Sequence, residues 1–488
     1  MGALDDAHLD EELQDAVGLE PGSGSETLST CEIEDAVKVL LHGLGEDPGR
    51  EGLKKTPLRV AKALRDGTRG YKQKVKDIVQ GALFPEAGLE NGMGCAGGAG
   101  GLVVVRDIDL FSYCESCLLP FSIQCHVGYI PSGERVVGLS KLSRVADVFA
   151  RRLQEPQRLA DEISSALQSS IKPAGVAVSL QCWHIQFPET LRCKSNLRHS
   201  SKLDMQGWFK ESVFSSSGVF KDENHPFWDD FLALLKFKGI DMEEIDAYHS
   251  PPAQSWCPSR SMDISSCNGH STRNPTNGKV SPKPGAAQTS MIAAVTSMIE
   301  ALGEDPSRKE LVGTPSRFVH WLTNFKRSNF EMKLNGFNLS RNDLHAKTAN
   351  GVAVTELNEI HTELNLPFCS QCEHHLLPFH GVVHIGYFGS DEGEIIQRCI
   401  LQSLVHFYGI KLQVQERLTR QIAETVYSVL GTGVIVVVEA SHICMISRGI
   451  EKVGSSTATM ALLGRFSTEP KAKAMFLRTI SKHNATGG

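Results

Sequence analysis

The chain has 488 residues, of which 41% are hydrophobic and 22% are charged, and its formal net charge is −6. This length exceeds one ordinary domain and predicts two or three. The acidic balance argues against a general nucleic-acid or membrane-surface binder, although it leaves room for a local basic pocket. No apolar run is long enough to span a bilayer.

The first residues and the cysteines indicate the compartment. The acidic N-terminus has neither the apolar core of a signal peptide nor the Arg/Ser-rich pattern of a transit peptide. Thirteen cysteines, an odd number, are scattered through the chain, which favours free thiols and metal ligands over a disulfide framework. We therefore expect a cytoplasmic protein.

An internal duplication organises the chain. The segment "GEDPGREGLKKTPLRVAKAL" from Gly45 matches "GEDPSRKELVGTPSRFVHWL" from Gly303, an offset of 258 residues. The same offset relates Cys114 to Cys372, and it persists to the C-terminal part of each copy. Because this period is far longer than a solenoid repeat, it predicts two fused copies of one domain.

Composition sets the predicted boundaries. Residues 1–29 are expected to be disordered, and the first domain to run over residues 30–245. Residues 246–287 are rich in Ser, Pro, Asn and Gly without apolar periodicity, which is typical of a flexible linker. The second domain follows over residues 288–488.

The predicted elements follow the same order in both copies. A helix opens each copy, over residues 34–44 and 290–302, and the motif Thr-Pro-x-Arg then enters a second helix. Strand-like apolar runs such as residues 381–388 come next. Residues 415–431 have helical spacing, and the apolar run 433–446 follows directly. This mixture predicts an α+β fold with an antiparallel sheet.

The segment "GMGCAG", residues 92–97, satisfies the Gly-x-Gly-x-x-Gly pattern of dinucleotide-binding sites. It precedes a strand-like run, whereas such a site requires a strand, a tight turn and then a helix N-terminus. We interpret it as a loop.

The stretch "CSQCEHHLLPF", residues 369–379, carries a metal-ligand spacing. Cys372 and His375 can reach one ion, and Cys444 in "SHICMISRG" is the natural third ligand. Two thiolates and one imidazole suit Zn²⁺, and three protein ligands leave a position for water, as in catalytic zinc sites. The alternative is that Cys369 and Cys372 form a CxxC redox pair or half of a zinc ribbon, although no second CxxC follows in this copy.

Three further residues of the second copy have side chains suited to chemistry. His374 and His442 stand next to the candidate ligands and can move protons near neutral pH, or they can be structural histidines. Glu416 lies at a predicted helix start. It can accept hydrogen bonds from the edge of a guanine, or it can simply complement the helix dipole.

The first copy has changed at these positions. It keeps Cys114 and Cys117, but Ser116, Gln157, Gln186 and Thr190 replace the counterparts of His374, Glu416, Cys444 and Arg448. It retains "GLSKLSR", in which Lys141 and Arg144 share one helical face beside Ser140. Two cations and a hydroxyl can hold a polyphosphate. The second copy has "IIQRCILQS" there, so each copy lacks what the other keeps.

Together "CEHH", "QVQERL", "HxCMxxRG", "GLSKLxR" and "TPxR" resemble GTP cyclohydrolase I over nearly the whole of both copies, and the tandem layout resembles the plant form. The resemblance implies two tunnelling-fold domains, each a four-stranded antiparallel sheet with two helices on one face, plus N-terminal helices. It also implies a homo-oligomeric ring with active sites at domain interfaces, GTP as substrate, and no nucleic-acid or membrane partner.

By the same resemblance, the zinc ligands are Cys372, His375 and Cys444, and the proton-transfer histidines are His374 and His442. Gln415 and Glu416 are the guanine-binding pair. Ser140, Lys141 and Arg144 of the first copy contact the triphosphate and ribose. Arg448 of the second copy does so too, and so does one of the Thr-Pro-x-Arg arginines, Arg59 or Arg317.

The implied reaction is the hydrolytic opening of the guanine imidazole ring, with release of formate and rearrangement to 7,8-dihydroneopterin triphosphate, the first step of pterin and folate synthesis. We expect a composite site, in which the second copy supplies zinc, acid/base groups and guanine recognition and the first supplies the phosphate clamp. About one zinc per chain follows from this view. The alternatives are a second domain that is the whole enzyme beside a regulatory first domain, or a tunnelling-fold enzyme that acts on a pterin.

Overall fold

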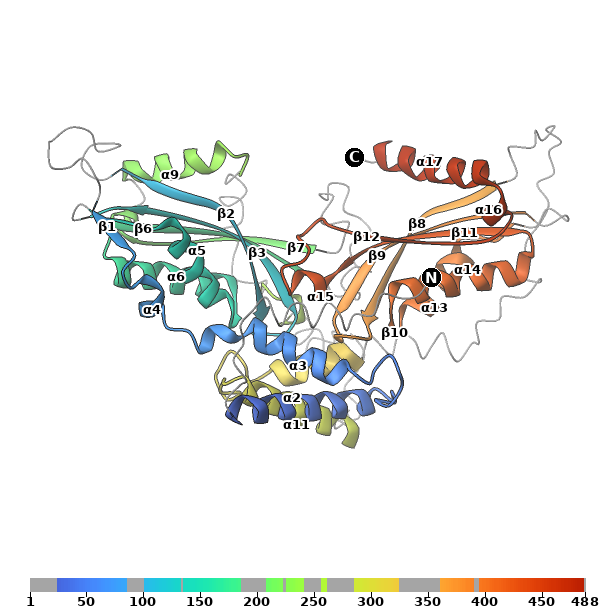
Figure 1. The fold of residues 1–488 in the computed structure, drawn as a ribbon, viewed down its shortest axis with the longest axis horizontal. Coiled ribbons are helices and arrows are strands. Elements are labelled where there is room, and N and C mark those ends of the chain that lie inside the picture. The colour runs from blue at the N-terminus through green and yellow to red at the C-terminus, as the bar shows by residue number, and fades with distance from the viewer. Residues whose placement is uncertain are drawn as a thin grey trace, which may run out of the picture.

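The computed structural model describes residues 24–85, 101–132, 135–185, 208–222, 225–240, 256–260, 285–323, 360–389 and 395–486. Two similar α+β lobes rise from a shared helical base and form a V, the first copy in blue to green and the second in orange to red (Figure 1). The tandem α+β architecture predicted from the repeat is therefore confirmed. None of the helices in these ranges is both long and apolar enough to cross a membrane.

The first lobe is built on a sheet in the order β5-β2-β3-β6-β7. Four long antiparallel strands form it, as the resemblance predicted: β2 (Val103–Cys114), β3 (Pro120–Ile130), β6 (Gly175–Ile185) and β7 (Trp208–Gly218). The two-residue β5 (Leu153–Gln154) adds a parallel fifth strand beside the end of β2. A separate small sheet pairs β1 (Leu83–Pro85) with β4 (Arg135–Val137).

The second lobe repeats this topology in the order β10-β8-β9-β11-β12. Its strands are β8 (Ile360–Cys372), β9 (Pro378–Phe388), β11 (Gly433–His442), β12 (Thr457–Gly464) and the short β10 (Leu412–Gln413). The end of β8 is held between β9 and β10, so the residues that follow Cys372 leave the sheet at a defined point.

Two helices cover one face of each sheet, as expected. They are α5 (Leu139–Ala150) and α6 (Pro156–Ile171) in the first lobe, and α13 (Arg398–Gly409) and α14 (Gln415–Leu430) in the second. The helical spacing in residues 415–431 works as predicted, because Leu418, Ile422 and Val426 are fully buried. Gly431 ends α14 in the left-handed conformation, with φ of 70°.

The opposite face of each sheet is also covered, which the sequence did not predict. There α9 (Pro226–Lys236) and α17 (Pro470–Thr486) pack their apolar residues on the strands, Phe231 and Leu235 in the first lobe and Phe476 and Ile480 in the second. The shorter helices are η1 (Arg69–Tyr71), α4 (Val75–Val79), η4 (Val219–Lys221), α15 (Ile443–Ile446) and α16 (Arg465–Thr468).

The base joins the two copies. Helix α2 (Gly24–Gly43) of the first copy lies antiparallel to α11 (Ala286–Ala301) of the second, since Ser29 near the start of α2 donates a hydrogen bond to the carbonyl of Ala301. Helix α3 (Thr56–Gly67) and the helical residues 314–323 lie between this pair and the sheets. Both copies contribute to one continuous hydrophobic core, so the lobes are held together by buried apolar surface.

Candidate functional site

The predicted ligands of the second copy converge. Cys372 ends β8, His375 lies in the turn that follows, and Cys444 lies in α15 directly after β11. One ligand atom from each lies within 4.8 Å of the other two. Both cysteines are buried and His375 is half-buried. These side chains can hold one metal ion with a side open to a ligand.

A tight turn aims the first two ligands at the third. Within it Cys372 donates its backbone N–H to Leu377, and Leu376 donates to the Cys372 carbonyl. Leu376 adopts a positive φ of 55°, which lets the chain reverse within five residues. The first copy has the same turn, with Leu118 at a φ of 58°. The "LLPF" that both copies share therefore encodes the turn, while the residues just before it include the candidate ligands.

The two thiols of this cluster differ in acidity. The hydrogen bond from the Cys444 thiol lowers the pKa of Cys372 well below its ordinary value, against the effect of burial, and His375 adds to the lowering. The same hydrogen bond, together with burial, raises the pKa of Cys444. The Cys372 sulfur, whose pKa is lowered, lies 4.0 Å from Nδ1 of His375.

His442 is held by Gln415. The Nε2 atom of His442 lies 2.7 Å from the Gln415 side-chain oxygen, and the Gln415 amide nitrogen donates to the carbonyls of Val438 and Thr457. Because those two carbonyls fix which end of the amide faces His442, Nε2 must carry a proton and Nδ1 keeps its lone pair. The ring stacks on Phe379 at 4.7 Å, and burial lowers its pKa.

His374 lies on the other side of the turn and is half-buried. Burial lowers its pKa, and the charge of Arg59 contributes to the lowering. Arg59 belongs to the Thr-Pro-x-Arg motif of the first copy, so the charge of a side chain from the other copy reaches this site. Arg317, its counterpart, instead donates from Nε to the Ser116 carbonyl of the first copy at 2.7 Å.

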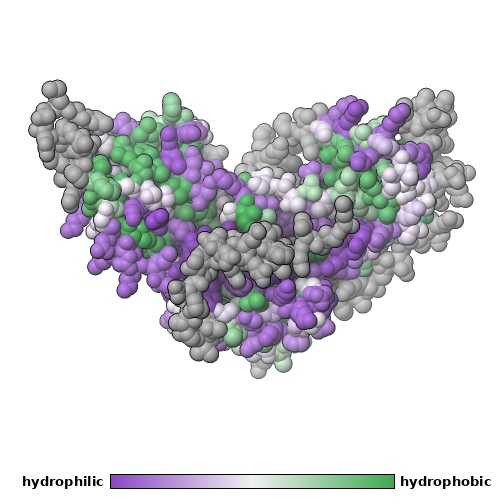
Figure 2. Space-filling model, in the orientation of Figure 1, coloured by the Kyte–Doolittle hydropathy of each residue, from purple (hydrophilic) through white to green (hydrophobic). Residues whose placement is uncertain are grey.

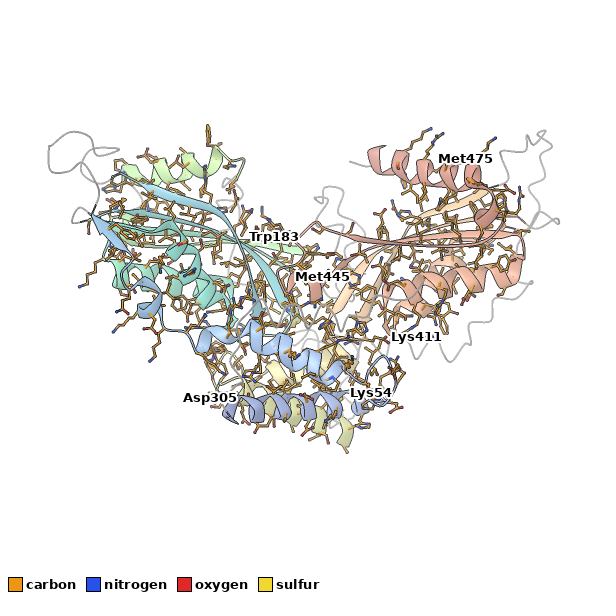
Figure 3. All side chains as sticks on the ribbon, in the orientation of Figure 1. Lys54, Trp183, Asp305, Lys411, Met445 and Met475 are labelled. Carbon is orange, nitrogen blue, oxygen red and sulfur yellow. The ribbon has the colours of Figure 1, made fainter. Side chains whose placement is uncertain are left out.

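The two motifs are thus exchanged between the copies. Thr56 donates to the Glu373 carbonyl, and Thr314 donates to the Glu115 carbonyl. Figure 3 shows Lys54 of the first copy beneath the second lobe and Asp305 of the second copy beneath the first. Each Thr-Pro-x-Arg segment therefore supports the turn of the other copy that holds Glu373 or Glu115.

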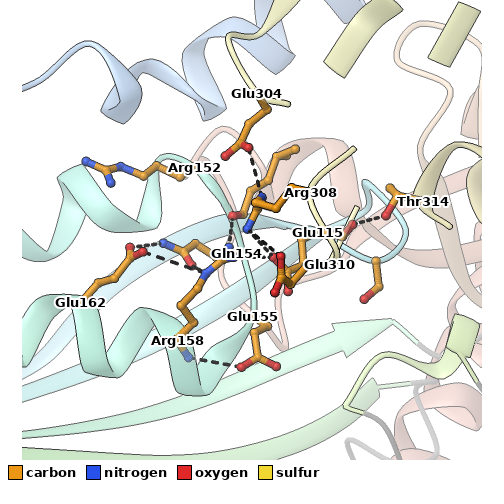
Figure 4. Close-up of polar contacts among 12 residues, drawn as sticks. Glu115, Arg152, Gln154, Glu155, Arg158, Glu162, Glu304, Arg308, Glu310 and Thr314 are labelled. Atoms are coloured by element: carbon orange, nitrogen blue, oxygen red, sulfur yellow. Dashed lines mark hydrogen bonds and ion pairs between the residues drawn. The ribbon is translucent and has the colours of Figure 1, made fainter. Parts of the chain in front are cut away.

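A buried carboxylate anchors each exchange. Arg50 and Arg417 hold Glu373 with contacts of 2.9 and 2.7 Å; burial opposes its ionisation, but the two guanidinium groups lower its pKa below the usual range. Arg158 and Arg308 approach Glu115 at 2.7 and 3.4 Å (Figure 4). There burial outweighs the cations and raises the pKa of Glu115.

The other predicted residues of the second copy lie around the cluster. Glu416 is exposed in the first turn of α14, and its charge reaches His442. Arg448 is exposed and donates to the Cys444 carbonyl at 3.0 Å. Met445, next to Cys444, lies at the junction of the two lobes (Figure 3).

The predicted phosphate clamp lies elsewhere. Ser140 and Arg144 are exposed and Lys141 is half-buried on α5, which contacts α6, β2, η1 and α4 of its own lobe. Figure 1 shows α5 on the outer part of the first lobe, away from α15. The chain therefore brings Arg59, but not Ser140, Lys141 or Arg144, to its own Cys372 cluster.

A second group of ligands escaped sequence analysis. In the first copy Cys114 and Cys117 meet His184 and Cys257, with the four ligand atoms within 4.8 Å of one another. The expectation of a degenerate metal site rested on aligned positions alone, whereas Cys257 comes from the predicted linker and has no counterpart in the second copy. The available signal was "SWCPS", an apolar Trp-Cys pair in a polar segment. Gln186, Thr190 and residues 92–97 lie outside the described residues.

Comparison with known proteins gives consistent matches. The family model for GTP cyclohydrolase I matches residues 33–216 and again residues 291–481. GTP cyclohydrolase 1 of Solanum lycopersicum is 59% identical over 489 residues, covering all of both chains. The Arabidopsis thaliana protein of that name is 54% identical over 492 residues, 99% of this chain and 98% of its own. The Dictyostelium discoideum protein of that name is 49% identical over 160 residues, 33% of this chain and 63% of its own.

Proposed function

The chain belongs to the GTP cyclohydrolase I family, and from that premise we propose that it opens the imidazole ring of GTP by hydrolysis, releases formate and forms 7,8-dihydroneopterin triphosphate. The observation that carries this proposal is the convergence of Cys372, His375 and Cys444 beside His442 and His374. This reaction is the first step of pterin and folate synthesis in the family.

Zn²⁺ is the metal that fits the cluster. Two sulfurs and one imidazole nitrogen are donors that zinc prefers, and Cys372 is disposed to be a thiolate before any metal binds. Bound there, zinc would supply a Lewis acid that activates water near neutral pH. Three protein ligands, one of them half-buried, would leave one position for that water.

The two histidines move protons. At neutral pH His442 is a neutral imidazole that carries its proton on Nε2 and can accept one at Nδ1. His374 is a second neutral base on the other side of the ligand turn. Gln415 acts as a positioning residue for His442, because its own amide is engaged by three hydrogen bonds within the protein. Glu416, exposed nearby, accepts from N1–H and the 2-amino group of guanine.

The triphosphate is bound by cations from three segments. Arg59 reaches the site from the first copy of the same chain, and Arg448 lies beside Cys444. Ser140, Lys141 and Arg144 come from the first copy of a neighbouring chain, since α5 lies away from the Cys372 cluster of its own chain. Ser140 assists the rearrangement of the ribose, and the cations keep C8 in place.

Exposed apolar side chains support this assembly. Phe84 and Leu139 are 52% and 56% exposed beside Ser140, and Ile450 is 58% exposed two residues after Arg448. Figure 2 shows hydrophobic side chains gathered on the face of the first lobe. In a homo-oligomer, contact between the surface around Phe84 and Leu139 of one chain and the surface around Ile450 of another would bury these side chains. It would also bring Ser140, Lys141 and Arg144 to the proposed zinc site.

Complementation between two inactive full-length variants tests the shared site. Lys141→Ala and His442→Asn should each lower formate release from GTP by about 100-fold. When the two variants are co-expressed in equal amounts, they should regain about a quarter of wild-type activity. About a quarter of the sites then combine the intact first copy of one variant with the intact second copy of the other. Full activity of Lys141→Ala alone would instead favour a regulatory first domain, and absence of recovery would favour a site within one chain.

A further inference from the structure

The first lobe contains a buried four-ligand cluster that the proposed reaction does not use. Cys114 ends β2, Cys117 lies in the following turn, and His184 lies near the end of β6. Cys257 comes from residues 256–260, between the two copies. The four side chains are each at most 1% exposed, and their ligand atoms lie within 4.8 Å of one another.

We propose that these residues bind a structural zinc ion, so that each chain holds two zinc ions with different roles. Three sulfurs and one imidazole form a complete tetrahedral ligand set for zinc. The second-copy cluster has three ligands and a half-buried histidine, whereas this cluster has four ligands and no exposed side. No position remains for water, so the site is structural rather than catalytic.

The tautomer of His184 suits this role. Its Nδ1 lies 2.7 Å from the Ile185 carbonyl, and a carbonyl can only accept, so Nδ1 carries the proton. In the neutral ring Nε2 then carries the lone pair, and it faces the sulfurs of Cys117 at 3.3 Å and Cys257 at 3.8 Å. A histidine that donates one ring N–H to a carbonyl and offers the other nitrogen is the usual arrangement at zinc sites.

Cys257 is placed by a docked segment and not by chance. The Trp256 ring packs edge-on against Phe121 at 5.1 Å and against His184 at 5.2 Å. Arg260 donates to the Ser116 hydroxyl at 2.7 Å, so the segment is held on both sides of the cysteine. The Ser259 hydroxyl lies 3.0 Å from the Cys257 sulfur, where it can donate to a thiolate.

Equivalent positions of the two copies have different roles. Cys114 and Cys117 occupy the positions of Cys372 and His375, while His184 occupies the position of the proton-transfer residue His442. In the first copy that histidine turns its lone pair to the sulfurs and becomes a ligand, and the linker adds the fourth. The zinc ion pins residues 256–260 to the first sheet and so sets where the chain departs for the second copy.

Zinc analysis of the purified full-length protein tests the proposal. Wild type should contain about two zinc ions per chain, against about one if only the catalytic site is filled. Cys257→Ala should contain about one zinc ion per chain and melt several degrees lower than wild type. The ion that it keeps should be the one at the Cys372 cluster, which Cys444→Ala should lose. The matched control is Cys125→Ala, which removes a fully buried thiol of the same lobe outside the cluster and should keep both ions.

Two measurements on wild type keep the test independent of variant folding. X-ray absorption should give an average of about 2.5 sulfur ligands per zinc, against about 2 for the catalytic site alone. All 13 cysteines should react with a thiol reagent in denaturant and chelator without reductant. The proposal would be overturned if the wild type held one zinc per chain and Cys257→Ala kept it. It would also be overturned if two thiols failed to react, because that would indicate a disulfide in the cluster. Neither result would affect the proposed reaction.

Discussion

The hydroxyl of Thr56 donates a hydrogen bond of 2.6 Å to the backbone carbonyl of Glu373, and this contact joins the first copy of the domain to the second. Glu373 stands between the candidate metal ligand Cys372 and the proton-transfer candidate His374. Thr314 makes the equivalent contact to Glu115 in the other direction. The first copy thus supports the turn that carries Cys372, His374 and His375, and the second copy supports the four-ligand cluster.

This exchange predicts unequal effects for two equivalent substitutions. Thr56→Val and Thr314→Val should each lower the free energy of unfolding by about 1 kcal/mol, because each leaves a buried carbonyl without its donor. Only Thr56→Val should also lower kcat for formate release, since the carbonyl that it frees lies between Cys372 and His374 of the proposed active site. Urea unfolding and steady-state kinetics separate the two effects, and equal kcat values in the two variants would contradict the exchange.

The arginines of the two Thr-Pro-x-Arg motifs should differ in the same way. Arg59→Ala should raise the KM for GTP by 10-fold or more, of order 1.4 kcal/mol, because the charge of Arg59 reaches His374 and a guanidinium can bind phosphate. Arg317→Ala should leave KM within about twofold, because Arg317 binds the Ser116 carbonyl of the first copy. A larger change in KM for Arg317→Ala than for Arg59→Ala would reverse the assignment.

Gln415 should matter for turnover more than for binding. Gln415→Ala removes the acceptor that holds the Nε2 proton of His442, so the ring can turn and change tautomer. We expect kcat to fall by about 100-fold with KM little changed. Zinc content serves as the control and should be unaffected, because Gln415 is not a ligand. A rise in KM with an unchanged kcat would assign Gln415 to guanine binding instead.

Two buried histidines make folding sensitive to acid. His126 and His384 accept hydrogen bonds at Nδ1 from the backbone N–H of Asp107 and Asn365, which lie at matching β-bulges with positive φ. Burial lowers the pKa of each histidine from 6.5 to about 4. The folded state therefore binds fewer protons than the unfolded state between these values, and stability that is complete above pH 6.5 is lost as the pH falls towards 4.

Each of these histidines should contribute roughly 3 kcal/mol to this loss. His384→Gln keeps an acceptor but cannot titrate, so its free energy of unfolding should fall less than that of wild type between pH 7 and pH 5. The exposed His42→Gln should follow wild type and is the control. Urea titrations at several pH values measure the difference, and parallel curves for His384→Gln and wild type would contradict the prediction.

The sequence was a good guide wherever the two copies could be compared position by position. The constant offset predicted two domains, helical periodicity predicted α14, and metal-ligand spacing predicted the Cys372, His375 and Cys444 cluster. These features are local, or they repeat, and local patterns are written in the order of residues. The helices α9 and α17 on the second face of each sheet were missed because nothing in the strands identified that face as covered.

Two features could not be read from the sequence because they depend on which segments meet in space. Arg59 and Arg317 occupy the same place in identical motifs, so only the packing of α3 brings the charge of Arg59 close enough to act on His374 of the second copy. Cys257 has no counterpart in the repeat, and only the docking of Trp256 on Phe121 brings its sulfur to Cys114, Cys117 and His184. The residue types determined which side chains of this chain could hold a metal ion. Tertiary packing decided which side chains share a site, since the distance between segments is set by the core and not by their separation along the chain.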